Sequence, residues 1–259
     1  QQSLSAYAQS KVVRSERSYW ENIIGARRQT LAQAQASYVN AEYSVNSLSR
    51  VEEALTLAFE LDNEPTSLLL DDCQQAYNTE MTDLLLAALA WHLRSFVAPG
   101  QFVVNVEGHG REAIDEMVDV SRTVGWFTAL YPVALISEKP FDLSDTIKYT
   151  KESVRSIPNK GIGFGLLEND LALSDKRGAS VGEIIKPEIL FNYLGIIEKN
   201  ESLGEKISFT RDFIVNEVGP KTKLSHAVEI TAQVNDGRLK VGLILDPQLL
   251  DKARAEAFM

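Results

Sequence analysis

Six consecutive residues, Glu107-Gly108-His109-Gly110-Arg111-Glu112, bring four ionisable side chains together around two glycines. Glycine lets a backbone approach a ligand closely, so this segment could direct its side chains into a shared cleft. A carboxylate that is partly removed from water in such a cleft has a raised pKa and can move a proton to and from a substrate. The segment therefore makes Glu107 a candidate acid or base, and the alternative is an ordinary charged turn at the surface.

The other residue types that carry chemistry offer weaker candidates. Histidines, cysteine and carboxylates nowhere show the spacing of metal ligands, so we expect no metal site. His92 continues the apolar stripe of a predicted helix and is expected to be structural, while His226 follows Ser225 at a strand start, where nothing nearby makes it a nucleophile's base. Cys73 follows two aspartates, which raise a thiol pKa, so we expect it to be inert. The glycine-rich stretch 160–165 lacks the G-x-G-x-x-G spacing and is predicted to be a tightly turned loop.

The elements that would position Glu107 alternate between strands and helices. Residues 101–107 alternate as a strand does, so Glu107 is expected to be its last residue, with Asn105 on the same face. Asn235-Asp236-Gly237 is a typical hairpin turn. Further strands are predicted within 42–61 and 125–136 and over 189–197, 226–234 and 238–245, and helices over 15–35, 66–76, 144–156 and from Asn78 or Thr79 to about Pro99. This order predicts one α/β domain over 1–259, with helices packed on a mixed, largely antiparallel sheet.

Composition limits the class of protein. The chain has 259 residues, a formal charge of −10, 44% hydrophobic and 24% charged residues, which is typical of a soluble globular protein. The acidic balance argues against binding to nucleic acid or to an anionic membrane. The longest apolar stretch, residues 84–91, is far shorter than the roughly 20 residues that span a bilayer. A single cysteine excludes internal disulfides and favours a cytoplasmic location.

Several stretches, in this order, resemble the later core motifs of the epimerization domains of nonribosomal peptide synthetases. They are TDLLLAA at 82–88, EGHGRE at 107–112, SRTVGWFT at 121–128 with Tyr131-Pro132, KGIGFG at 160–165 and FNYLG at 191–195. EGHGRE and RTVGWFT together distinguish epimerization domains from ordinary condensation domains. The resemblance implies membership of the condensation-domain superfamily, whose two-lobed fold is similar to that of chloramphenicol acetyltransferase.

The activity that this resemblance implies is epimerization from L to D at Cα of an aminoacyl or peptidyl thioester. The substrate is carried on the phosphopantetheine arm of a peptidyl carrier protein, and no tightly bound cofactor is implied. Removing and returning the Cα proton requires acid and base groups on the two faces of Cα, and donors near the thioester oxygen.

The resemblance also implies roles for individual residues. Glu107 matches the catalytic glutamate, and Tyr193 is expected to donate to the enolate or to relay a proton. Arg111 matches a structural arginine whose usual partner is an aspartate in the opposite lobe. Trp126 is expected either in a pocket wall or in the core. The residues expected to contact substrate are Asn192, Trp126, Asn105 and His109.

One part of the family pattern is missing. The first lobe of the family carries His-His-x-x-x-Asp-Gly, and this chain has no adjacent histidine pair. We therefore expect the chain to be the C-terminal lobe alone, cut from a longer synthetase because it begins at Gln1 without methionine, and to need the histidine-bearing lobe for catalysis. The alternatives are a non-catalytic lobe that binds carrier protein and a lobe of a condensation-type acyltransferase.

Overall fold

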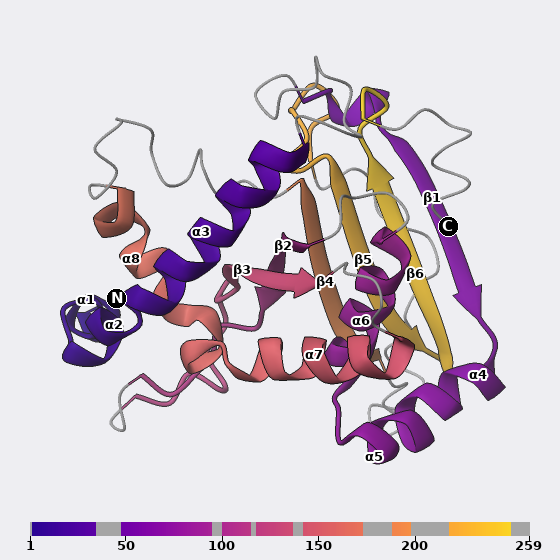
Figure 1. The fold of residues 1–259 in the computed structure, drawn as a ribbon, viewed down its shortest axis with the longest axis horizontal. Coiled ribbons are helices and arrows are strands. Elements are labelled where there is room, and N and C mark those ends of the chain that lie inside the picture. The colour runs from indigo at the N-terminus through magenta and orange to yellow at the C-terminus, as the bar shows by residue number, and fades with distance from the viewer. Residues whose placement is uncertain are drawn as a thin grey trace.

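A single six-stranded sheet organises the part of the chain that the computed structural model describes, residues 2–34, 48–94, 100–114, 118–136, 142–172, 188–197 and 218–249 (Figure 1). The strands are β1 (Leu55–Leu61), β2 (Gln101–Gly108), β3 (Ala129–Ile136), β4 (Ile189–Ile197), β5 (Val228–Asn235) and β6 (Arg238–Leu245). The helices are α1 (Gln2–Ala8), α2 (Lys11–Ser15), α3 (Arg17–Ala34), α4 (Asn63–Leu68), α5 (Gln74–Tyr77), α6 (Met81–Leu93), α7 (Leu143–Arg155) and α8 (Ile162–Ala172). Short 3₁₀ turns lie at Val51–Glu53 and Pro158–Gly161, and a π-helical turn at Leu69–Cys73.

The sheet is mixed, in the order β1-β6-β5-β4-β2-β3. The pairs β1/β6, β5/β6 and β2/β3 are antiparallel, and the pairs β2/β4 and β4/β5 are parallel. The predicted fold class, an α/β fold with a mixed and mostly antiparallel sheet, is confirmed. The parallel strands in the middle come from distant parts of the sequence, so their carboxyl ends meet at one edge of the sheet.

Helices cover one face of the sheet, and this face holds the apolar core. Figure 1 shows α3, α6 and α7 crossing in front of the strands. Val104, Phe191 and Ile230 point from neighbouring strands into a core that also contains Trp20 of α3 and Phe164 of α8. The rings of Trp20 and Phe164 lie 5.0 Å apart, within the range of favourable aromatic pairs. Alternation along the strands places Asn105, Glu107, Asn192 and Glu229 on the opposite face of β2, β4 and β5.

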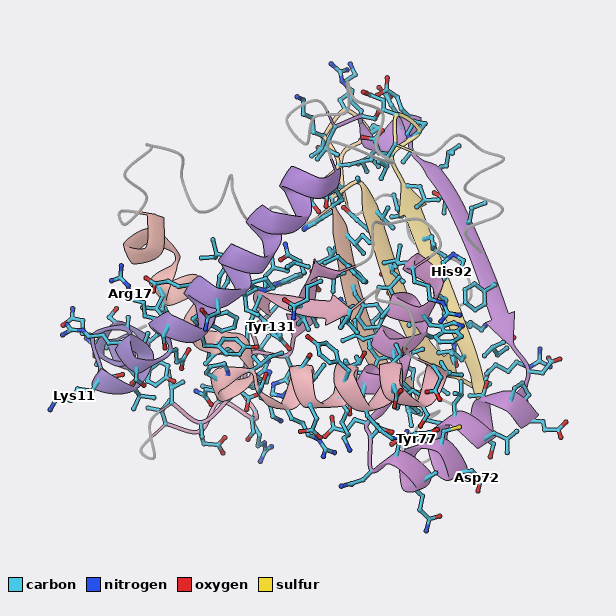
Figure 2. The ribbon with its side chains drawn as sticks, viewed as in Figure 1. Lys11, Arg17, Asp72, Tyr77, His92 and Tyr131 are labelled. Carbon is cyan, nitrogen blue, oxygen red and sulfur yellow. The ribbon has the colours of Figure 1, made fainter. Side chains whose placement is uncertain are left out.

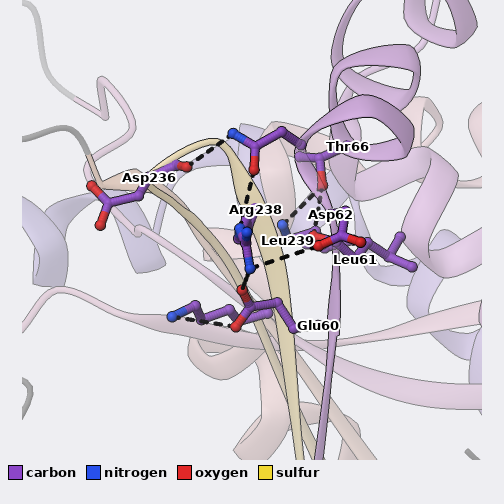
Figure 3. Close-up of polar contacts among 9 residues, drawn as sticks. Glu60, Leu61, Asp62, Thr66, Asp236, Arg238 and Leu239 are labelled. Carbon is purple, nitrogen blue, oxygen red and sulfur yellow. Dashed lines mark hydrogen bonds and ion pairs between the residues drawn. The ribbon is translucent and has the colours of Figure 1, made fainter.

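The predicted β5–β6 hairpin is present, and its turn is fixed by local chemistry. Asp236 and Gly237 both have positive φ, 51° and 74°, as a tight turn between twisted strands requires. Next to this turn Arg238 donates to Glu60 at 3.1 Å and to Asn63 at 3.1 Å, which ties the hairpin to β1 and α4 (Figure 3). These contacts are exposed, so they align the strands more than they stabilise the fold.

The start of α6 differs from the prediction. Helix α6 begins after Glu80, whose backbone N–H donates to the Asp83 carboxylate at 2.9 Å, and not after Asn78 or Thr79. Asn78 instead ends α5 in the left-handed conformation, φ 50°, which asparagine tolerates better than most residues.

The predicted loop at 160–165 is wrong beyond Gly161, because α8 begins at Ile162. Phe164 and Leu167 are three residues apart and both buried, so a helix places them together in the core. The glycines allow close packing: a Cβ added to Gly161 would lie 2.1 Å from the Tyr131 ring, and one added to Gly163 would lie 2.1 Å from the Glu16 carboxylate.

Other boundaries are shorter than predicted. Within 42–61 the strand covers only Leu55–Leu61, and residues 42–47 lie outside the described part of the chain. Within 125–136 the strand covers Ala129–Ile136. The end predicted for α6 near Pro99 also falls on residues outside the described part, after the C-cap at Arg94.

Candidate active site

Glu107 lies near the end of β2, half-buried, next to β4. The parallel register pairs Glu107 with Asn192, and the Asn192 side-chain Nδ2 donates to Glu107 Oε2 at 2.6 Å. Both residues were expected in the site from sequence, and the structure brings them together although 85 positions separate them. The amide holds one carboxylate oxygen of Glu107 in place, as expected of a positioned acid or base.

The surroundings of Glu107 favour its protonated form. Burial raises the pKa of Glu107 above its ordinary value, and the negative charge of Glu229 on β5 raises it further. A carboxyl group with a raised pKa is a stronger base when ionised and is closer to exchanging protons near neutral pH. Glu107 therefore has the electrostatic setting that proton transfer requires.

Asn105 precedes Glu107 by two residues and lies on the same face of β2. Its side chain is 6% exposed, and its Nδ2 lies 3.0 Å from Nε2 of His226, which is 7% exposed. On the other side of the ring, Nδ1 lies 2.7 Å from Ser225 Oγ, which donates to Glu229 Oε1 at 2.7 Å. No role was expected for His226 from the sequence. The sequence feature that could have indicated these contacts is the grouping of Ser225, His226 and Glu229 at the start of a predicted strand.

The glycines around His109 serve the turn itself. Gly110 has φ +62°, and a Cβ added there would lie 1.6 Å from the Phe127 carbonyl oxygen. His109 Nε2 lies 3.0 Å from Glu112 Oε1, and its Nδ1 accepts from the Arg111 backbone N–H at 3.0 Å. The close approach that Gly110 permits is thus to another loop of this chain, and the His109 ring braces the turn.

Arg111 holds the loop that follows the EGHGRE turn. Its guanidinium carbon lies 4.2 Å from the centre of the Phe127 ring. Its guanidinium nitrogens donate to three backbone carbonyls, those of Val120 at 2.5 Å, Thr123 at 3.0 Å and Gly125 at 3.4 Å. Arg111 therefore has contacts of a structural kind within this chain, and its pairing with an aspartate of the opposite lobe stays a prediction.

The structure also fixes the positions of two other predicted site residues, Trp126 and Tyr193. Trp126 is 90% exposed, so of the two expected positions the core is excluded. Tyr193 pairs with Ala232 and packs against the apolar core, on the face of β4 opposite to Asn192. Burial raises the pKa of Tyr193. The structure therefore does not bring Tyr193 alongside Glu107.

Tyr131, part of the same motif series, is also a core residue. Figure 2 shows it in the middle of the fold, whereas Lys11 and Arg17 lie at the periphery. Burial raises the pKa of Tyr131 to about 12, and the charge of Glu112 adds to this effect. Its ring fills the space left by Gly161, so its role is packing.

The described residues leave a cavity of about 1000 Å³ next to Asn105. Its polar wall contains Asn105, Ser225 and His226, and its apolar wall contains Leu4, Ile162 and Leu130. Trp126 and Phe127 also line it. Within the described ranges no group of three or more His, Cys, Asp or Glu residues is arranged to hold a metal ion. None of the helices described is both long and apolar enough to cross a membrane.

Comparison with known proteins places the whole chain in one family. The family model described as "Condensation domain" matches residues 2–259. The chain is 38% identical over 240 residues to bacitracin synthase 3 of Bacillus licheniformis and 35% identical over 240 residues to tyrocidine synthase 2 of Brevibacillus parabrevis. These matches cover 92% and 93% of the chain but only 4% and 6% of those synthases. The chain thus corresponds to a small part of each relative.

Solved structures agree with this assignment. The epimerization domain from the third module of tyrocidine synthetase B superimposes with a TM-score of 0.81 at 32% sequence identity. The match covers 99% of this chain and 55% of that domain. The condensation enzyme VibH superimposes with a TM-score of 0.61 at 16% identity, over 98% of this chain and 53% of VibH, which shows a shared fold.

Proposed function

Because the chain belongs to the condensation-domain family of nonribosomal peptide synthetases, we propose that it supplies the glutamate-bearing half of an epimerization site. The observation that carries this proposal is Glu107 at the end of β2, with a raised pKa and held by Asn192 at 2.6 Å. The substrate would be an aminoacyl or peptidyl thioester on the phosphopantetheine arm of a carrier protein.

In the proposed reaction one base removes the Cα proton, and an acid on the opposite face of Cα returns a proton. The electron pair of the broken C–H bond is delocalised onto the thioester oxygen as an enolate, and reprotonation restores the thioester with inverted configuration. Glu107 would be one of the two groups. The other would come from the lobe that carries His-His-x-x-x-Asp-Gly. This chain covers 55% of the similar epimerization domain, which supports a division of the site between two lobes.

Tyr193 has no part in this proposal, although sequence reasoning expected it to be catalytic. Its ring packs with the core on the other face of β4, so it does not share a face with Glu107. Asn192, which contacts Glu107, and Asn105, which lines the cavity, are the better candidates for contacts with the substrate.

Epimerization is favoured over condensation by two observations. The EGHGRE and RTVGWFT motifs resemble those of epimerization domains, and the match at 32% identity is to an epimerization domain. The condensation enzyme VibH is only 16% identical to this chain, and that similarity concerns the fold. The alternative is a lobe that binds carrier protein without catalysing exchange, and the next experiment distinguishes it from the proposed function.

The test is deuterium wash-in at Cα of a carrier-bound aminoacyl thioester, with this chain present in a two-lobed domain. Glu107→Gln keeps the size of the side chain and its contact with Asn192 but removes the base, and it should slow exchange by about 10²–10⁴-fold. Glu152→Gln is the matched control, since this carboxylate lies on α7 and its side chain is 70% exposed. Exchange at the wild-type rate in Glu107→Gln would exclude Glu107 as the base.

A further inference from the structure

A continuous chain of hydrogen bonds runs beside Glu107 and is not accounted for by the proton transfer. It links Asn105, His226, Ser225 and Glu229, with distances of 3.0, 2.7 and 2.7 Å in that order. The backbone N–H of His226 also donates to Glu229 Oε1 at 3.3 Å. Three elements contribute to this chain: β2, the segment before β5, and β5 itself.

The direction of each bond follows from counting hydrogens. Ser225 has one hydroxyl hydrogen, which it donates to Glu229 Oε1. Nδ1 of His226 lies 2.7 Å from the same hydroxyl oxygen, so Nδ1 must carry a hydrogen and donate it to Ser225. A neutral imidazole has one N–H, which leaves Nε2 as the acceptor for the amide hydrogen of Asn105. Every link then has one donor and one acceptor.

Both ends of this chain are coupled to Glu107, one through the strand and the other through its charge. At one end, Asn105 lies two residues before Glu107 on the same face of a strand, about 6.7 Å along the backbone. At the other end, the charge of Glu229 acts on Glu107. Asn105, Ser225 and His226 all line the cavity described above.

We propose that Ser225, His226 and Glu229 are positioning residues that hold the Asn105 amide in one orientation beside Glu107. The proposal rests on the function proposed above for Glu107. With its nitrogen committed to His226, Asn105 offers its carbonyl oxygen as a hydrogen-bond acceptor to a ligand in the cavity. The matching donor on an aminoacyl or peptidyl thioester is the N–H at its α-carbon, so Asn105 would orient Cα toward Glu107.

The same geometry assigns His226 a role different from that of a catalytic base. The ring is buried, and both of its nitrogens face hydrogen-bond partners within this chain. His226 therefore does not replace the histidine that the family supplies from its first lobe. Glu229 and Ser225 fix which ring nitrogen of His226 carries the hydrogen, and the other nitrogen then fixes the orientation of the Asn105 amide.

The first test is the tautomer of His226 in the 259-residue chain, measured by long-range ¹H–¹⁵N correlation at neutral pH. The chain has only three histidines, so His92→Gln and His109→Gln suffice to assign the spectrum. We expect His226 to carry its hydrogen on Nδ1, which is the less common tautomer of free imidazole side chains. A hydrogen on Nε2 would mean that the Asn105 amide is turned the other way, and would overturn the proposal.

The second test compares Ser225→Ala with Ser225→Thr, which keeps the hydroxyl. Ser225→Ala should move the hydrogen of His226 to Nε2 and, in the two-lobed domain, lower kcat/KM for Cα exchange by about 10-fold, mainly through KM. Ser225→Thr should retain the Nδ1 tautomer and most of the activity, and thermal unfolding of both variants separates these effects from misfolding. Wild-type tautomer or wild-type KM in Ser225→Ala would overturn the proposal.

The two proposals fail in different ways. If Glu107→Gln retains exchange, the function proposed for Glu107 is wrong, while the tautomer of His226 still decides whether the hydrogen-bond chain exists. If Glu107→Gln abolishes exchange and Ser225→Ala changes neither tautomer nor KM, only the positioning role is wrong.

Discussion

Substitution of Gly110 by alanine should destabilise the fold by an amount that can be worked out from the structure. Gly110 has φ +62°, where a residue with a Cβ costs about 1–2 kcal/mol. The new Cβ would also lie 1.6 Å from the Phe127 carbonyl oxygen. Ordinary non-bonded contact is about 3.5 Å, so that carbonyl must move by about 2 Å.

The displaced segment is the one that Arg111 holds through three carbonyls and the Phe127 ring. Losing one of these bonds costs about 1 kcal/mol, which brings the expected loss for Gly110→Ala to about 2–3 kcal/mol. For a chain of this size the loss corresponds to a decrease in Tm of about 5–10 °C.

The assay is urea unfolding of the 259-residue chain, with Gly165→Ala as the matched control. Gly165 lies in α8, and a Cβ there would have nothing within 4 Å among the described residues, so this variant should be neutral or up to about 1 kcal/mol more stable. A Gly110→Ala midpoint and slope equal to those of the wild type would refute the argument from backbone conformation and crowding.

Two further predictions concern buried polar groups. Burial raises the pKa of Glu16 above its ordinary value of 4.5, so the folded state holds this proton more tightly than the unfolded state, and stability falls as pH rises above 4.5. Glu16→Gln should therefore be more stabilising at pH 8 than at pH 4 in urea unfolding, and an equal difference at both pH values would contradict this reasoning. Thr66 accepts from the Leu239 backbone N–H at 3.0 Å and donates to the Leu61 carbonyl at 3.3 Å (Figure 3). Thr66→Val should cost about 1–3 kcal/mol in thermal unfolding, because both backbone groups lose their partner, and Thr66→Ser should recover part of that loss.

Features that depend on nearby residues could be predicted from the sequence. The Asp236-Gly237 turn needs two left-handed residues in succession, and that requirement is visible in the residue types. The helix α7 was predicted over 144–156 and covers Leu143–Arg155, because Asp142 accepts from the Asp145 N–H as an N-cap. The position of Glu107 near the end of a strand was likewise predicted from alternation and the glycines that follow.

Features that depend on packing between distant segments could not be predicted. The glycines at 161–165 suggested a loop, but the Tyr131 ring and the Glu16 carboxylate occupy the space next to two of them. Tyr193 and Asn192 are adjacent in a predicted strand and so point to opposite faces, but only the sheet register shows that Asn192 is the one that shares a face with Glu107. The bond between Asn105 and His226 joins residues 121 positions apart, which no local pattern indicates.

Glu107 lies on the strand pairing with the fewest residue pairs in the described sheet, the parallel pairing of β2 with β4. Within the described residues three residue pairs join these strands, Asn105 to Leu190, Val106 to Phe191 and Glu107 to Asn192, whereas β2 and β3 pair over eight. This pairing joins segments far apart in sequence, so its formation has a large cost in loop-closure entropy. We therefore expect it to form late in folding. Glu107 and Asn192 occupy its last pair, which is one of the two ends from which this pairing can fray. The Asn192 contact of the Glu107 carboxylate is therefore expected to form late and to be lost early, and a force that separates the β2–β3 ribbon from the rest of the sheet would remove it.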